Sequence, residues 1–187
     1  MTDAHGRTSS DGNGKSKSAS AASRHVLWHI PNVPVVGKPQ LMYLLPGQLH
    51  ASAEPCQIKT ILGSCVSICL WDKRHLAGGM NHFLLAASRE GEPASLRFAD
   101  VATAELLKRL ERLGCRTRDL TAKIFGGSAL FQKENCYAAS LGAKNVAAAL
   151  WLMKNAGIPV AAQETGGTQG RRIVLNTADG AVLCQRI

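Results

Sequence analysis

The feature that most constrains the fold of this chain is the stretch 58–72, in which apolar and β-branched residues predominate. Turn-forming residues break it at Gly63-Ser64, so each half has the length of a buried strand rather than of a helix. A second apolar run, 77–85, follows a short polar segment. We therefore expect strands on both sides of Gly63-Ser64, and a neighbouring strand over 77–85.

Two other segments have the periodicity of helices. In residues 99–113, leucines recur at 106, 110 and 113 between charged residues, with Asp100 as the expected N-cap and Gly114 as the stop. Residues 145–155 repeat the pattern and end at Gly157. These segments predict two amphipathic helices.

Strand patterns and tight turns fill most of the remaining chain. Short strands are expected at 40–45, 122–125 and 158–163, and a hairpin is expected to pair 172–176 with 181–185. Many strands with few crossover helices favour an α+β fold, with mixed β-sheets packed as a core and flanking helices.

Composition narrows the class of protein. Of the 187 residues, 45% are hydrophobic and 19% are charged, as in a globular protein with one core. The apolar runs are too short to span a bilayer and the N-terminus lacks a secretory-signal pattern, so a cytoplasmic protein is expected. Residues 1–23, rich in Ser, Gly and Asn, predict a disordered tail before a single domain over 24–187.

Charge and cysteine content are less decisive. The net charge of +9 favours an acidic partner, which leaves nucleic acid, a lipid surface or an acidic protein open. No aromatic residues interleave with a basic run, which disfavours a nucleic-acid platform. The six cysteines include no C-x-x-C pair, so neither a disulfide scaffold nor a zinc site is expected.

One cysteine and one histidine are the strongest candidates for catalytic residues. Cys65 follows the Gly63-Ser64 turn, and His82 lies in the next apolar run, so adjacent strands can bring thiol and imidazole together. A thiol activated by an imidazole is the minimal machinery for attack on a carbonyl, and a neighbouring histidine is expected to lower the thiol pKa. Backbone N–H groups near Gly63 are expected to hold the oxyanion.

A third group is expected to orient the imidazole. Thr60 is the first candidate, and Ser64, Ser67 and Asn81 lie within reach in the sequence. For each of these residues, as for Cys65 and His82, an ordinary place in the protein core is the competing interpretation.

The paired glycines have two interpretations. Gly126-Gly127 and Gly166-Gly167 either surround a pocket that substrate backbone must approach closely, or simply end strands. A phosphate-binding loop is not expected, since neither a P-loop lysine nor a full G-x-G-x-x-G pattern is present.

Taken together, these residues resemble the CheD family, the chemoreceptor glutamine deamidases, over about residues 38–187. The blocks that carry the resemblance are 62–66 with Asp72, Gly78 and His82, then 125–128, 142–146 and 166–172. The resemblance implies a catalytic Cys65 and His82 with an upstream threonine, for which Thr60 has the right place. It also implies a fold related to bacterial toxin cysteine deamidases.

The expected activity is therefore hydrolysis of glutamine side chains of methyl-accepting chemoreceptors through a thioester, with no metal or cofactor. The resemblance implies a substrate in the receptors' cytoplasmic helical bundle, and some members of the family also bind a CheC-type phosphatase. Three alternatives remain open: a non-catalytic docking module for receptors or the phosphatase, a related enzyme such as a transglutaminase or peptidase-like hydrolase, and a nucleic-acid-binding protein.

Overall fold

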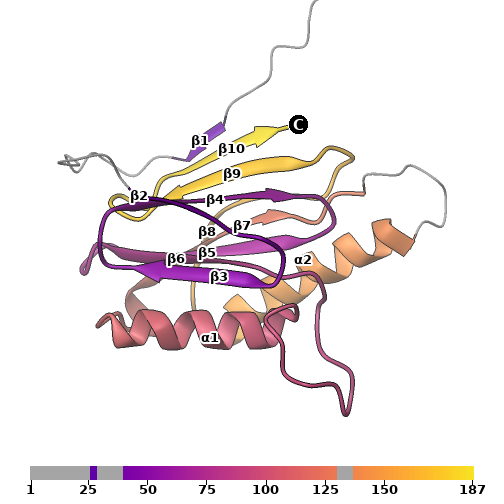
Figure 1. Ribbon diagram of the computed structural model, residues 1–187, viewed down its shortest axis with the longest axis horizontal. Helices are drawn as coiled ribbons and strands as arrows, with labels where there is room; N and C mark the ends of the chain where they lie inside the picture. The colour runs from indigo at the N-terminus through magenta and orange to yellow at the C-terminus, as the bar shows by residue number, and fades with distance from the viewer. Residues whose placement is uncertain (1–25, 29–39, 130–136) are drawn as a thin grey trace, which may run out of the picture.

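The computed structural model describes residues 26–28, 40–129 and 137–187, in which ten strands form two five-stranded sheets (Figure 1). In spatial order, the first sheet contains β1 (Val26–Trp28), β10 (Val182–Arg186), β9 (Arg171–Asn176), β4 (Cys56–Leu62) and β2 (Gln40–Tyr43). The second contains β3 (Gln48–Ser52), β6 (Ala77–His82), β5 (Val66–Asp72), β7 (Leu120–Gly126) and β8 (Val160–Thr165). The pairs β2–β4 and β7–β8 are parallel and the other pairs antiparallel, so both sheets are mixed.

The sheets stack face to face, and both helices lie on the far side of the second sheet (Figure 1). Helix α1 (Ala99–Arg112) packs on β3 and β6, whereas α2 (Tyr137–Asn155) packs on β5, β7 and β8. A 3₁₀ turn, η1 (Thr117–Asp119), leads from α1 into β7. The arrangement confirms the expected α+β class.

The second sheet is covered on both faces, which explains the apolar run after Cys65. Every residue of β5 and β6 is buried. Ile68 and Leu70 point toward the helices, and Cys69 points into the core between the sheets. Burying one such aliphatic side chain contributes about 1.5–3 kcal/mol, so this central position accounts for the composition of the run.

Two expected details are wrong. The N-cap of α1 is Phe98, which makes no side-chain capping bond, and Asp100 is the second helical residue. There its charge still favours the positive end of the helix dipole. Helix α2 begins at Tyr137 rather than at Asn145, because its early residues lack the apolar periodicity by which the helix was expected.

Strand β3 was not expected at all. It is a short edge strand in which only Leu49 is fully buried, so it has almost no alternating pattern. The predicted tail over residues 1–23 lies outside the described residues, and the likeness to toxin deamidases stays a prediction. None of the helices in the described ranges is long and apolar enough to cross a membrane.

Candidate active site

Strand pairing places Cys65 and His82 on one face of the second sheet. The β5–β6 register pairs Cys69 with Met80, and it continues through a bridge between Val66 and Phe83. Because side chains alternate along strands, Cys65 and His82 then share the face that holds Cys69 and Met80. That face looks toward the first sheet, and half-buried Cys65 packs against the core there.

Thr60 reaches the imidazole from the first sheet. Its hydroxyl lies 2.8 Å from the carbonyl oxygen of Leu44 and 2.8 Å from His82 Nδ1, and its side chain is fully buried. A hydroxyl has one proton, which Thr60 donates to the carbonyl, so it must accept its second bond from Nδ1–H. His82 Nε2 consequently keeps its lone pair, the form required of a base.

His82 Nε2 is buried and has no hydrogen-bond partner among the described residues. The same is true of Ser67 Oγ, which the register places on the strand position opposite His82. Buried polar atoms without partners are uncommon, and they often mark a place where a ligand completes the bonding. Ser67, which the sequence analysis gave as one of several residues within reach, therefore places a second buried polar atom without a partner opposite His82 among the described residues.

Burial keeps both reacting groups neutral. It lowers the pKa of His82 to about 4, against a smaller opposing effect of the Leu44 carbonyl, and it raises the pKa of the Cys65 thiol. The direction for Cys65 is opposite to the lowering expected from a neighbouring histidine, because desolvation outweighs any stabilisation of the thiolate. Sulfur and Nε2 share no hydrogen bond in the described structure, which leaves the thiol without that stabilisation.

The turn before β5 is fixed by its carbonyl groups. Ser128 N–H donates to the Gly63 carbonyl, Gly127 N–H donates to the Cys65 carbonyl, and the Asn145 amide donates to the carbonyls of Ser64 and Leu84. In the described part of the chain, no backbone carbonyl accepts from the N–H of Ser64 or Cys65. These two donors are thus available beside the sulfur.

Asn145 is a positioning residue that the sequence analysis placed in a predicted helix and in the block 142–146 of the resemblance, without a role in the site. It is fully buried on α2, and its bonds tie that helix to the Cys65 turn and to the segment after His82. A buried asparagine in the first half of an amphipathic helix was the available signal, since such an amide needs partners.

Four glycines around the site have backbone conformations that other residues rarely adopt. Gly126 and Gly127 have φ of +111° and +69°, and Gly166 and Gly167 have φ of +69° and +70°. A Cβ atom on Gly126 would collide with the Cys65 carbonyl, so only glycine allows this approach. Gly63, in the turn before Cys65, is not among the described glycines with positive φ.

Buried Arg171 joins the two glycine turns. Its guanidinium donates to the Gly166 carbonyl at 2.7 Å and to the Ser128 hydroxyl. It holds the segments that follow β7 and β8 together.

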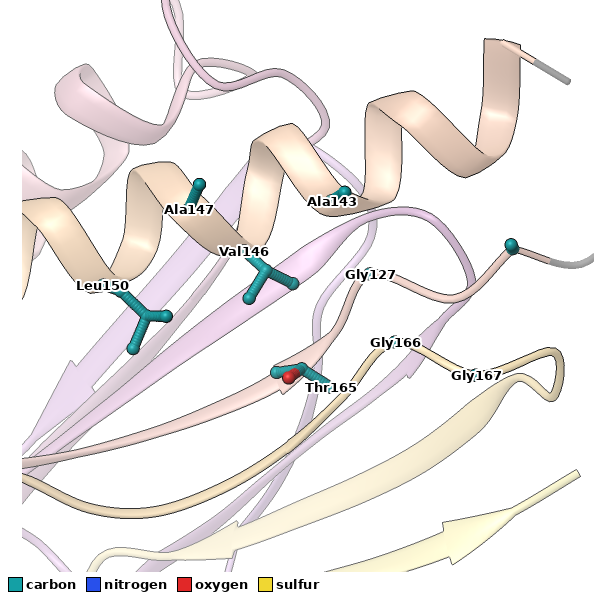
Figure 2. A pocket seen from close by; sticks show the side chains of 9 residues that line it. Gly127, Ala143, Val146, Ala147, Leu150, Thr165, Gly166 and Gly167 are labelled. Carbon is teal, nitrogen blue, oxygen red and sulfur yellow. The ribbon is translucent and has the colours of Figure 1, made fainter. Parts of the chain in front are cut away.

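A groove of about 460 Å³ runs between these turns and α2 (Figure 2). Gly127, Gly166 and Gly167 form one wall, and Val146 and Leu150 extend toward it from the helix. The paired glycines therefore end strands, and Gly127, Gly166 and Gly167 also line a hollow; a close approach of substrate backbone there stays a prediction. Gly127 also donates its N–H to the Cys65 carbonyl, whereas the Cys65 side chain packs toward the first sheet and does not line the groove.

Comparisons with known proteins agree on one family. The family model described as CheD chemotactic sensory transduction matches residues 84–186, a range that begins after His82. A Rhodospirillum rubrum protein named "Probable chemoreceptor glutamine deamidase CheD" is 46% identical over 145 residues, or 78% of this chain and 81% of the relative. A Trichlorobacter lovleyi protein of the same name is 40% identical over 144 residues, or 77% of this chain and 89% of the relative.

Among solved structures, the Neisseria meningitidis protein NMB0706, of the family DUF152, has a TM-score of 0.40 with 11% identity. The match covers 79% of this chain and 75% of that chain. The sequence relatives are far more similar, and the chain covers more than four-fifths of each of those two. The chain belongs to the CheD family.

Proposed function

We propose that this protein is a cytoplasmic protein-glutamine glutaminase that deamidates chemoreceptors, as the names of its relatives suggest for those proteins. The observation that carries the proposal is the bond between Thr60 and His82 Nδ1, which selects the tautomer with a basic Nε2. A buried histidine prepared in this way, on the same sheet face as a half-buried cysteine, supports nucleophilic catalysis.

In the first half of the reaction, the substrate carboxamide lies against Cys65. His82 Nε2 takes the thiol proton as sulfur attacks the amide carbon, and the N–H groups of Ser64 and Cys65 donate to the oxyanion. The imidazolium then gives its proton to the amide nitrogen, and the carbon–nitrogen bond breaks. Ammonia leaves, and a thioester joins Cys65 to the substrate.

In the second half, His82 accepts a proton from water as the water oxygen attacks the thioester carbon. The tetrahedral species collapses with breakage of the carbon–sulfur bond, and the imidazolium returns its proton to Cys65 sulfur. The product is a glutamate side chain. Because both groups start neutral, proton transfer and attack occur together, and no stable thiolate is required.

The charge of the chain suits the proposed substrate. With a net charge of +9, the protein attracts an acidic partner, and receptor segments rich in glutamate are of that kind. Each deamidation adds one negative charge to the receptor.

The test is mass spectrometry of a chemoreceptor cytoplasmic fragment incubated with wild type, Cys65→Ala or Cys69→Ala. Cys69 lies on the same strand face but is buried in the core, so it is the matched control. Wild type and Cys69→Ala are expected to convert specific glutamines to glutamate, and Cys65→Ala is expected to leave them intact. Equal conversion by Cys65→Ala would refute the proposal.

A docking module for receptors or for a CheC-type phosphatase is the second candidate. The raised pKa of the Cys65 thiol is the observation in its favour, since burial leaves little of the nucleophilic thiolate. This alternative predicts that the receptor fragment binds with equal affinity to wild type and Cys65→Ala, and that neither protein converts a glutamine.

A further inference from the structure

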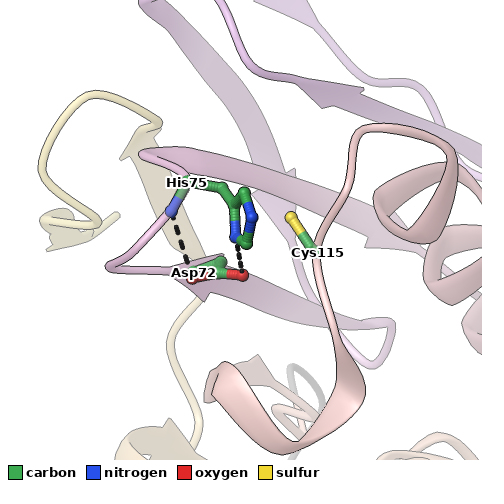
Figure 3. Close-up of side chains that lie close together, drawn as sticks. All are labelled: Asp72, His75 and Cys115. Carbon is green, nitrogen blue, oxygen red and sulfur yellow. Dashed lines mark hydrogen bonds and ion pairs between the residues drawn. The ribbon is translucent and has the colours of Figure 1, made fainter.

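A second group of reactive side chains lies at the other end of β5. Asp72 ends that strand, His75 follows in the turn to β6, and Cys115 comes from the connection after α1 (Figure 3). One oxygen, one nitrogen and one sulfur atom of these residues all lie within 4.8 Å of one another. Along β5 the cluster is about 23 Å from Cys65, so it is separate from the candidate active site.

The turn that follows β5 fixes the carboxylate. Asp72 Oδ1 accepts from the backbone N–H of Arg74 at 2.8 Å and of His75 at 3.3 Å. Its other oxygen, Oδ2, lies 2.8 Å from His75 Nδ1. Leu76 closes the turn with a φ of +50°, a conformation that costs a non-glycine residue free energy.

The charges around the cluster leave the carboxylate without a strong cation. Asp72 is completely buried, and Arg74, in the turn that follows it, pairs with Asp119 at 3.6 Å instead. A buried carboxylate needs a compensating positive charge. Among the described residues, Asp72 has side-chain hydrogen bonds with His75 and Cys115 and no ion pair with a lysine or an arginine.

We propose that Asp72, His75 and Cys115 bind one divalent zinc-type cation. Carboxylate oxygen, imidazole nitrogen and thiolate sulfur are the three ligand types that Zn²⁺ uses in proteins. Water completes the tetrahedron from the side of His75, whose side chain is 37% exposed, whereas Asp72 and Cys115 are buried. On binding, the Cys115 S–H bond breaks, the proton passes to solvent, and a sulfur–metal bond forms.

The two N–H bonds to Asp72 Oδ1 orient the carboxylate as outer-shell bonds do in known metal sites. Such an ion would connect the β5–β6 turn to the segment between α1 and β7, and so stabilise the sheet at the end remote from Cys65. The site escapes sequence inspection because Cys115 is far from the other two residues in the chain and no paired ligand spacing is present.

The experiment is a titration of the chelator-treated full-length protein with Co²⁺, which reports thiolate ligation by a charge-transfer absorption, followed by displacement with Zn²⁺. The variants are Cys115→Ser and His75→Ala. Cys65→Ala is the matched control, because it removes the other cysteine that lies near a histidine. Far-ultraviolet circular dichroism checks that each variant is folded.

Wild type and Cys65→Ala are expected to bind one equivalent of Co²⁺ with the thiolate band, and Zn²⁺ is expected to abolish that band. Cys115→Ser is expected to lose the band, and His75→Ala is expected to bind Co²⁺ at least about tenfold more weakly. Absence of the band in wild type, or its persistence in Cys115→Ser, would overturn the proposal. Loss of the band in Cys65→Ala alone would also overturn it, by locating the metal at the other site.

Discussion

Replacing Thr60 by valine tests the arrangement of the active site at one atom. Valine keeps the shape of the fully buried side chain but removes the hydroxyl that bonds both the Leu44 carbonyl and His82 Nδ1. The imidazole then loses the bond that selects its tautomer, and Nε2 no longer has to carry the lone pair. We expect kcat to fall while the Michaelis constant stays nearly unchanged, since Thr60 faces the histidine rather than the groove.

The size of the effect follows from the hydrogen bond that is lost. A buried donor without a partner costs about 1–3 kcal/mol. At about 1.4 kcal/mol per tenfold in rate, loss of this free energy from the transition state slows the reaction about 5- to 150-fold. The free energy of unfolding should fall by a similar amount, about 2 kcal/mol, because the Leu44 carbonyl loses its partner too.

The assay measures initial rates of glutamate formation in a receptor fragment, at saturating and subsaturating concentrations. Thr60→Ser is the matched variant, because it keeps the hydroxyl and loses only a methyl group. It should recover most of kcat. If Thr60→Val turns over as fast as wild type, or if Thr60→Ser is as slow as Thr60→Val, the hydroxyl does not position His82.

Three further predictions concern pH and the support of the site. Burial lowers the pKa of His82 to about 4, and a protonated imidazole cannot accept the thiol proton. We therefore expect kcat/KM to fall only as the pH drops through about 4. A fall of kcat/KM near pH 6.5 would contradict this prediction. Because burial raises the pKa of Cys65, its alkylation by iodoacetamide without substrate should still be accelerating at about pH 9, and a plateau from neutral pH upward would show a preformed thiolate. Arg171→Met should lower the free energy of unfolding by about 2–3 kcal/mol in urea titrations, because the Gly166 carbonyl and the Ser128 hydroxyl lose a charged donor. The control is Arg172→Met, at the half-buried neighbouring position, which should lower it by less than half as much.

The central strands were the most predictable part of the fold. The break at Gly63-Ser64 separates β4 from β5 as expected, and the apolar run after Cys65 is buried throughout. Such a pattern reports burial directly, because a strand covered on both faces has almost no polar position. The hairpin of β9 and β10 was also predictable, since its turn residues lie between two alternating segments.

Elements held by tertiary contacts were not predictable in the same way. Strand β3 exists because it pairs with β6 and is covered by α1, and its own residues are half polar. The start of α2 at Tyr137 likewise leaves no mark in the apolar periodicity. In both places, packing rather than local preference decides the structure.

The candidate site divides in a similar way. Cys65, His82 and Thr60 were predicted as site residues from residue type and spacing. The hydrogen bonds by which Asn145 holds the Cys65 turn depend on a helix from far along the chain, so they could not be predicted in this way. The direction of the Cys65 pKa was missed for the same reason. Burial of the thiol is a property of the assembled sheets, and spacing from a histidine does not report it.

The most direct test of the proposed chemistry is to trap the covalent intermediate. Wild-type protein is mixed with a receptor fragment, quenched in acid at short times, and analysed by intact mass and peptide mapping. A thioester between Cys65 and a receptor glutamine side chain, with the loss of one ammonia and with release by hydroxylamine, is the predicted result. Deamidation that proceeds in Cys65→Ala without any adduct would contradict the account.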